Sequence, residues 1–215
     1  MTNFTLQGLY AITDPELLPG TKLIEGVEAA LRGGARVVQY RDKAASAEKK
    51  HRSASELLAC CRDYQVPLLI NDDLALAEAI GADGVHLGLT DHDLADARRR
   101  LGPNAIIGAT CHASLDLARQ ARAVPVDYVA FGRFFPSQTK SSAPPAPLSL
   151  LEPARQLGMP IVAIGGITPD NASQVIEAGA DMLAIVHGLF AADDIEARAR
   201  MLSSLFLPSD RNSSP

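Results

Sequence analysis

Short apolar runs alternate with amphipathic stretches along almost the whole chain of 215 residues. Short runs rich in β-branched side chains are typical of buried strands, and apolar residues that recur every three or four positions are typical of helices packed on one face. The predicted strands are Leu9–Thr13, Val37–Tyr40, Leu68–Ile70, Val85–Leu87, Ile106–Ala109, Tyr128–Phe131, Ile161–Ile164 and Met182–Val186. The predicted helices are Leu23–Arg32, Ser46–Arg62, Leu74–Ile80, Leu94–Leu101, Ser114–Ala121, Leu148–Leu157, Asn171–Ala178 and Ile195–Leu205.

This alternation of strand and helix indicates right-handed βαβ units and a parallel sheet. Eight such units favour an α/β fold with one domain, a closed (β/α)8 TIM barrel, and the length of the chain suits a single domain. A doubly wound open sheet is the structural alternative. No G-x-G-x-x-G follows the first predicted strand, which counts against a dinucleotide-binding form of that alternative.

Glycine-rich segments follow three of the predicted helices. They are Gly33-Gly34-Ala35, Gly81-Ala82-Asp83 and Gly179-Ala180-Asp181, and each lies just before a predicted strand. Glycine accepts the left-handed conformation that ends a helix, so these segments are expected to turn the chain back into the sheet. We expect the barrel to span residues 1–207 and the small, polar stretch 208–215 to be a disordered tail.

Composition and charge narrow the class of partner. The chain is 47% hydrophobic and 21% charged, as in ordinary globular proteins, and its formal net charge of −5 argues against nucleic acid as a partner. No apolar run is long enough for a membrane span, and no basic segment precedes an apolar core near Met1. The cysteines Cys60, Cys61 and Cys111 lack the spacing of a metal site. We expect a cytoplasmic protein with reduced thiols and no nucleic-acid or membrane partner.

Polar residues follow several of the predicted strands. Because the carboxyl ends of the strands of a parallel barrel meet at one face, these residues are expected to gather in one site. Gln39, Arg41 and Lys43 alternate with period two after the second strand, so an extended backbone would direct all three to the same side. They are either a row of ligands for a phosphate or pyrophosphate, or ordinary solvated charges at a strand end.

Carboxylates follow the third and fourth predicted strands. One of Asn71, Asp72 and Asp73 is expected to cap the helix that begins at Leu74, because such side chains accept hydrogen bonds from unpaired helix amides. Asp72 and Asp91 lie on successive loops, so their carboxylates could approach one cation. Oxygen ligands with few histidines or cysteines nearby suit Mg²⁺.

The loops after the last three strands carry small and hydroxyl-bearing residues. Gly165-Gly166-Ile167 and Val186-His187-Gly188 follow the seventh and eighth strands, where barrels often bind phosphate, although packing in tight turns is the alternative for the glycines. The irregular stretch 136–147 has the length typical of a lid or binding loop. His86 is expected to be a satisfied, buried imidazole in a strand, and the adjacent Cys111 and His112 are weak evidence for a nucleophile.

Between Leu9 and Phe206 the chain resembles thiamine-phosphate synthases, also called thiamine-phosphate pyrophosphorylases. Each matching piece is short, but all of them occur in order on successive predicted strands. The pieces are Leu9-Tyr10-Ala11-Ile12-Thr13-Asp14, Val38-Gln39-Tyr40-Arg41-Asp42-Lys43, Leu69-Ile70-Asn71-Asp72, Gly84-Val85-His86-Leu87-Gly88 with Asp91, Gly108-Ala109-Thr110-Cys111-His112, Phe135-Pro136-Ser137-Gln138-Thr139-Lys140, Ala163-Ile164-Gly165-Gly166-Ile167 and Gly179-Ala180-Asp181.

The resemblance implies a transferase with two small-molecule substrates, a pyrimidine diphosphate and a thiazole phosphate (or carboxythiazole phosphate). The products would be thiamine phosphate and pyrophosphate, and Mg²⁺ would be required. In the family the substitution is dissociative: pyrophosphate leaves first, and the thiazole nitrogen then attacks the pyrimidine cation. The resemblance leaves a homo-oligomer open, because no interface can be read from this chain.

The resemblance also implies roles for individual residues. The pyrimidine diphosphate would be held by Gln39, Tyr40, Arg41, Asp42, Lys43, Asn71, Thr110 and Lys140, of which Arg41, Lys43 and Lys140 would stabilise the departing charge. The thiazole phosphate would be held by Ser137, Gln138, Thr139, Gly166, Val186 and His187, and the metal by Asp72 and Asp91. Leu89 departs from the family, which commonly has glutamine there. His187 stands where serine is more usual, so a side-chain contact at that position is an open question.

Two other functions are consistent with a barrel of this kind. One is a thiazole tautomerase-like isomerase, and the other is a non-catalytic sensor of thiamine precursors. A tautomerase would not need the cations, the carboxylate pair and Lys140 together, and a sensor would be expected to have lost at least one of them. The residues therefore favour the transferase.

Overall fold

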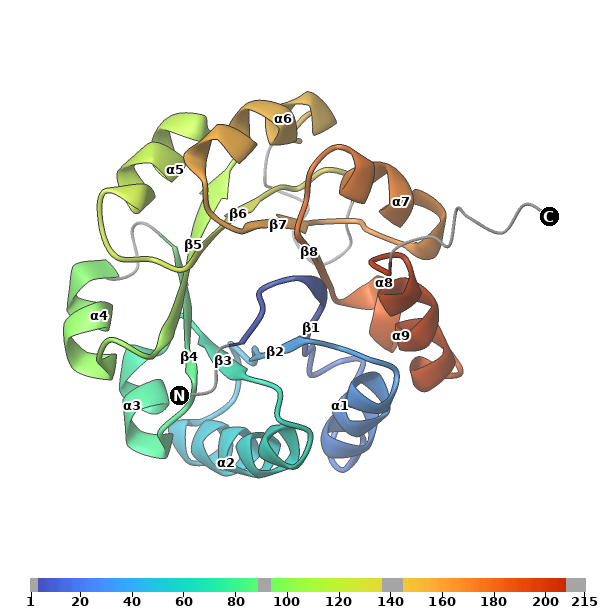
Figure 1. The fold of residues 1–215 in the computed structure, drawn as a ribbon. Coiled ribbons are helices and arrows are strands. Elements are labelled where there is room, and N and C mark those ends of the chain that lie inside the picture. The colour runs from blue at the N-terminus through green and yellow to red at the C-terminus, as the bar shows by residue number, and fades with distance from the viewer. Residues whose placement is uncertain (1–3, 89–93, 137–144, 208–215) are drawn as a thin grey trace.

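The computed structural model describes residues 4–88, 94–136 and 145–207. Eight parallel strands form a closed barrel in sequence order, and the first strand pairs with the last (Figure 1). The predicted (β/α)8 barrel is confirmed, and the open sheet is excluded because no strand is left at an edge. The strands are β1 (Gly8–Ile12), β2 (Val37–Tyr40), β3 (Leu68–Asn71), β4 (Gly84–Gly88), β5 (Ile106–His112), β6 (Tyr128–Phe131), β7 (Ile161–Ile164) and β8 (Met182–Ile185).

Helices surround the barrel on its outer face (Figure 1). They are α1 (Lys22–Arg32), α2 (Ala47–Asp63), α3 (Leu74–Ile80), α4 (Leu94–Leu101), α5 (Leu115–Arg122), α6 (Leu151–Ala154), α7 (Pro169–Glu177), α8 (His187–Phe190) and α9 (Ile195–Ser204). Among the described residues no helix is both long enough and apolar enough to cross a membrane. The short helix α8 was not predicted as a separate element.

Most predicted boundaries lie within two residues of the observed ones, but two predicted elements differ from the structure by more. The sixth helix was predicted as continuous, but 3-10 turns Leu148–Leu150 and Arg155–Leu157 flank a short α6. Pro153 has no amide hydrogen and so cannot bond the carbonyl four residues earlier, which shortens the α-helical part. Strand β5 extends three residues beyond its predicted end, so Cys111 and His112 belong to the strand itself; Cys111 is buried and His112 is exposed.

Apolar side chains form two cores, one inside the barrel and one between the barrel and the helices. This burial on both faces explains why the strands read as continuous apolar runs. The inner core contains Tyr10, Ile12, Val37, Leu69, Ile106, Tyr128, Ala130, Val162, Met182 and Ala184. Residues that alternate with these along the strands, such as Leu9, Val38 and Ile70, belong to the outer core.

The glycines expected to end helices behave in two ways. Gly34, Gly81 and Gly179 have φ angles of 99°, 64° and 116°, in the left-handed region that favours glycine. Gly33 has an ordinary φ of −77°. A Cβ atom at Gly33 would lie 2.4 Å from the Cβ of Ala199, so close packing of α9 requires glycine there.

Aspartates join neighbouring strands at the amino-terminal end of the barrel. Asp83, Asp127 and Asp181 precede β4, β6 and β8. Their carboxylates accept the amides of Leu68, Ile107 and Ile161 at 2.9, 2.7 and 2.8 Å. The amide of each aspartate donates back to the carbonyl of the same partner. Each aspartate thus forms a reciprocal pair of hydrogen bonds with the start of the preceding strand.

Candidate active site at the carboxyl ends of the strands

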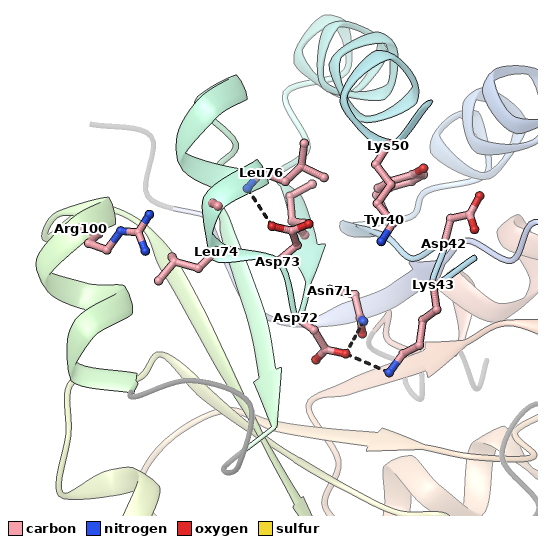
Figure 2. A pocket seen from close by; sticks show the side chains of 12 residues that line it. Tyr40, Asp42, Lys43, Lys50, Asn71, Asp72, Asp73, Leu74, Leu76 and Arg100 are labelled. Carbon is pink, nitrogen blue, oxygen red and sulfur yellow. Dashed lines mark hydrogen bonds and ion pairs between the residues drawn. The ribbon is translucent and has the colours of Figure 1, made fainter. Parts of the chain in front are cut away.

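The end of β3 and the loops after β2 and β3 bring three of the predicted site residues together. The Nζ atom of Lys43 lies 3.1 Å from Oδ2 of Asp72, and the side-chain amide of Asn71 donates to the same oxygen at 2.8 Å (Figure 2). The side chain of Asp72 is 30% exposed and that of Lys43 is 60% exposed. A carboxylate, an ammonium group and an amide thus face solvent at the barrel mouth, where an anionic ligand or a cation could replace the ion pair.

The backbone separates the roles of two adjacent aspartates. Asp73 is the N-cap of α3, and its Oδ1 accepts the amide of Leu76 at 2.9 Å, as expected for one residue of this segment. Asp72 has a φ of 60°, a left-handed conformation that is uncommon for any residue other than glycine. Such conformations cost about 1–3 kcal/mol and concentrate at functional sites. This conformation leaves the carboxylate of Asp72 free of the helix.

A cavity of about 410 Å³ adjoins this group (Figure 2). Its lining includes Lys50 of α2 and Arg100 of α4, which sequence reasoning did not select. Both lie on helices rich in charged residues, so no local signal marked them. Arg100 forms an ion pair with Glu78, whereas Lys50 makes no ion pair within the described part of the chain.

The row predicted from Gln39, Arg41 and Lys43 is not a single extended row. Strand β2 ends at Tyr40, so the period-two argument does not extend beyond it. The main chain of Arg41 is held instead by Thr13, whose hydroxyl accepts the Arg41 amide at 2.9 Å. Asp42 organises the loop, because its Oδ1 accepts the amides of Ala44 and Ala45 at 3.1 and 3.0 Å.

The side chains of Gln39 and Tyr40 lie on opposite sides of β2. Gln39 is 2% exposed and faces the barrel interior, where its amide nitrogen donates to the hydroxyl of Tyr10 at 2.6 Å. Tyr40 is 4% exposed and packs in the core between barrel and helices. Only Gln39 is therefore directed toward the axis of the barrel, where the other strand ends converge.

The interior holds a continuous row of polar side chains, here called the polar row. It runs through Gln39, Tyr10, Tyr128, His86 and Thr110. The hydroxyls of Tyr10 and Tyr128 are 2.9 Å apart, and Tyr128 lies 2.9 Å from Nδ1 of His86. Nε2 of His86 lies 2.8 Å from the hydroxyl of Thr110. His86 is thus a satisfied imidazole as expected, although it is only partly buried.

Sequence reasoning missed Tyr10 and Tyr128. Both occupy inward-facing strand positions and are 1% and 0% exposed. Burial raises the pKa of both phenols well above the ordinary value, so both keep their protons. A tyrosine in an apolar strand usually finds a hydrogen-bond partner when buried, which is the signal that could have identified them.

Close packing accounts for the glycines after β7. Gly165 and Gly166 have φ angles of 101° and 66°. A Cβ atom at Gly166 would lie 2.4 Å from the carbonyl oxygen of Pro136, and one at Gly165 would lie 2.3 Å from Cβ of Arg133. The packing interpretation therefore holds for both, whether or not phosphate binds beside them.

The loop after β8 presents main-chain donors. Val186 precedes α8, and His187 is the first residue of that helix. Within the described part of the chain, the amides of Gly166, His187 and Gly188 donate no hydrogen bond to another main-chain carbonyl. These amides have the chemistry of an anion-binding site, whichever side chain stands at position 187.

Five predicted ligands lie outside the described residues: Asp91, Ser137, Gln138, Thr139 and Lys140. Most of the predicted lid, 136–147, lies outside them as well. Among the residues that are described, no three of His, Cys, Asp and Glu gather as metal ligands. Asp72 offers one hard oxygen donor, which suits a Mg²⁺ ion held by few protein ligands and completed by water and phosphate.

Comparison with known proteins gives a consistent result. The family described as thiamine monophosphate synthase matches residues 9–189. Thiamine-phosphate synthase of Methylobacillus flagellatus is 54% identical over 201 residues, which cover 94% of this chain and 96% of the relative. Thiamine-phosphate synthase of Marinobacter nauticus is 56% identical over 201 residues, 93% of this chain and 90% of the relative. The solved structure of thiamine phosphate pyrophosphorylase from Pyrococcus furiosus is 33% identical, with a TM-score of 0.84 over 94% of this chain and 96% of that chain.

Proposed function

The chain belongs to the thiamine-phosphate synthase family, and we propose that it uses the carboxyl end of its barrel to join the two halves of thiamine phosphate. It is a transferase acting on small-molecule thiamine precursors. The observation that carries the site assignment is the meeting of Lys43, Asn71 and Asp72 at the barrel mouth, beside an open cavity.

The substrates of the proposed reaction are 4-amino-2-methyl-5-(hydroxymethyl)pyrimidine diphosphate and thiazole phosphate or its carboxylated form. We assign Arg41, Lys43 and Lys140 to the diphosphate, whose charge increases as the carbon–oxygen bond breaks. Cations that contact this developing charge stabilise the transition state more than the ground state. Asn71, Gln39 and Thr110 would orient the pyrimidine, with Tyr40 and Asp42 supporting the loop.

Asp72, together with Asp91, would hold Mg²⁺. When bound, the ion would neutralise part of the diphosphate charge. In the structure Asp72 forms an ion pair with Lys43, and both side chains are in contact with solvent. The carboxylate of Asp72 could therefore bind a metal ion as well, and the ammonium group of Lys43 would stay solvated. The carboxylate of Asp73 is already used as a helix cap and is not assigned to the metal.

The thiazole phosphate is assigned to the opposite side of the barrel mouth. Ser137, Gln138 and Thr139 would contact it together with Val186 and the amides of Gly166 and His187. Three of the amides on this side, those of Gly166, His187 and Gly188, have no main-chain acceptor among the described residues, which supports an anion here. The imidazole of His187 is not required by this assignment.

The proposed substitution is dissociative. Pyrophosphate leaves, the aminopyrimidine ring delocalises the positive charge, and the thiazole nitrogen attacks with its own lone pair. No protein nucleophile is needed, and the one candidate raised by the sequence is a poor one. Cys111 is buried in β5, and burial raises the pKa of its thiol to about 12, so it stays protonated near neutral pH.

Turnover of both substrates, measured with and without Mg²⁺, tests the function. The proposal predicts thiamine phosphate and pyrophosphate in equal amounts, with loss of turnover when the metal is chelated. A tautomerase-like isomerase would change the thiazole substrate without the pyrimidine diphosphate, and a sensor would bind the precursors without product. Either result would contradict the proposal.

We further propose that the enzyme acts in the cytoplasm, where phosphorylated precursors are retained by their charge. A homo-oligomer stays an open proposal, because it requires an interface that the single chain does not define. Sedimentation of the purified protein at several concentrations decides this point.

A further inference from the structure

The polar row crosses the inside of the barrel and ends at two residues assigned above to the substrate. Gln39 lies at one end, on β2, and Thr110 at the other, on β5. Between them Tyr10, Tyr128 and His86 connect β1, β6 and β4. These strands are distant in sequence, so the row exists only because the barrel closes.

The number of protons on each group determines which residue donates and which accepts in each hydrogen bond of the polar row. The Gln39 amide nitrogen faces Tyr10 and can only donate to it. The single proton of Tyr10 has one described acceptor left, the hydroxyl of Tyr128. The single proton of Tyr128 then goes to Nδ1 of His86, which must accept. A neutral imidazole has one N–H group, so it lies on Nε2 and donates to Thr110.

With the amide nitrogen of Gln39 facing Tyr10, the reverse order would leave one buried hydroxyl proton without an acceptor among the described residues. If Tyr128 donated to Tyr10, Tyr10 would accept twice, and its own proton would have no described partner. An unsatisfied buried donor costs about 1–3 kcal/mol. The order from Gln39 to Thr110 gives both phenol protons and the imidazole proton an acceptor.

Packing holds the rings of Tyr10, Tyr128 and His86 in the positions that these hydrogen bonds require. Tyr10 and Tyr128 meet edge to face, with ring centres 6.0 Å apart, and His86 stacks on Tyr128 at 5.6 Å. Gly108 on β5 leaves space for the phenol, because a Cβ atom there would lie 2.0 Å from Cζ of Tyr128. Packing thus fixes the positions of the hydrogen-bonding atoms.

We propose that the polar row fixes Thr110 as a hydrogen-bond donor toward the ligand, with Tyr10, Tyr128 and His86 as positioning residues. Thr110 accepts from His86, so its own proton points away from the row. The ligand atom that receives this proton must be an acceptor, which in an aminopyrimidine is a ring nitrogen. This last step rests on the proposed function; the proton order within the row does not.

The proton order is tested by NMR of the full chain with ¹⁵N-labelled histidine, without substrate and at neutral pH. The signal of His86 is assigned by its loss in His86→Gln. The proposal predicts that His86 carries its proton on Nε2 only. A proton on Nδ1, or protons on both nitrogens, would overturn the order.

A tyrosine variant then tests whether the row sets the tautomer. Tyr128→Phe removes the proton that Nδ1 of His86 accepts and is expected to leave His86 as a mixture of the two tautomers. Tyr64→Phe is the matched control, because Tyr64 bonds Glu28 on the outside of the barrel and should leave the His86 signal unchanged. A His86 signal in Tyr128→Phe that matches the wild-type signal would show that the row does not set the tautomer.

The role of Thr110 is tested by removing its proton while keeping its shape. Thr110→Val should lower kcat/KM for the pyrimidine diphosphate about tenfold to a hundredfold, the effect of one unsatisfied hydrogen bond. Thr110→Ser keeps the hydroxyl and should stay within a few-fold of wild type. Equal losses in both variants would contradict a donor role.

Pyridine analogues, in which one ring nitrogen is replaced by C–H, test the acceptor. In the wild type, one of the two analogues should bind more weakly than the pyrimidine diphosphate itself. In Thr110→Val, that analogue and the pyrimidine diphosphate should bind equally well. Additive losses with both analogues would refute the contact. Failure of the proposed function would appear as absence of turnover in the wild type, whereas the NMR result stands independently of it.

Discussion

Aspartates occur at both ends of the barrel, and they differ in their partners. At the amino-terminal end Asp83, Asp127 and Asp181 bond main-chain amides and carbonyls of neighbouring strands. At the carboxyl end the carboxylate of Asp72 is held only by the side chains of Lys43 and Asn71, within the described part of the chain. Its backbone also has a φ of 60°.

This difference in partners indicates that the aspartates at the amino-terminal end contribute to stability, whereas Asp72 contributes to function. A main-chain partner cannot be exchanged without disrupting the strand, so an aspartate bound to it contributes to the fold. A side-chain partner can rotate away when a ligand arrives, so Asp72 can change partners while the barrel stays intact.

The largest expected effect is at the carboxyl end. Asp72→Asn should lower kcat about 10²–10³-fold at limiting Mg²⁺, because single electrostatic groups commonly contribute this much to a charged transition state. Asparagine tolerates the left-handed backbone, so the melting temperature should change little. Asp73→Asn is the matched control: asparagine caps helices as well as aspartate does, and kcat should be unaffected. Wild-type turnover in Asp72→Asn would remove Asp72 from the metal site.

Gly166→Val should be the most destabilising change at the same end. The left-handed φ of 66° and the 2.4 Å approach of Pro136 leave no room for a side chain, so we expect a loss of at least about 2 kcal/mol in unfolding free energy. Urea denaturation of the variant measures it. Unchanged stability with lost thiazole-phosphate affinity would instead assign Gly166 to ligand binding alone.

At the amino-terminal end, Asp181→Ala should cost stability without affecting catalysis. It removes the acceptor for the amide of Ile161, a residue only 1% exposed, at a cost of about 1–3 kcal/mol. For a chain of this size, the melting temperature should fall by about 2–10 °C. The kcat of the folded variant should equal that of the wild type. If the kcat of Asp181→Ala fell as much as that of Asp72→Asn, the aspartates at the two ends of the barrel would not differ in function.

The smallest effect is expected at His187. If the thiazole phosphate is bound mainly by main-chain amides, His187→Ser should change its KM by less than about twofold at neutral pH, since a few tenths of a kcal/mol is the usual size of a surface change. Steady-state kinetics with varied thiazole phosphate measures this. A large increase in KM would make the imidazole a direct ligand.

Much of the fold could be predicted because local periodicity and barrel architecture agree. All eight strands were located from apolar runs, since both faces of each strand are buried. The boundary errors have local causes, such as the missing amide hydrogen of Pro153. The candidate site could be predicted in part, because residues after parallel strands necessarily share one end of the barrel.

Other features of the site could not be read from local pattern. Period-two reasoning placed Gln39, Arg41 and Lys43 on one row, but the strand ends before Arg41. Asp72 and Asp73 are chemically identical, and only the backbone conformation separates the cap from the exposed carboxylate. Lys50 reaches the cavity from a helix whose sequence looks like an ordinary solvated face.

The sequence alone determined the order of the elements, the face that each one buries and the end of the barrel at which polar side chains collect. Those properties follow from spacing along one segment. Only the tertiary structure decided which side chains meet across the interior, as Tyr10, Tyr128 and His86 do on β1, β6 and β4. The stagger between strands, which arises when the sheet closes, sets such contacts, and no single segment of the chain contains that information.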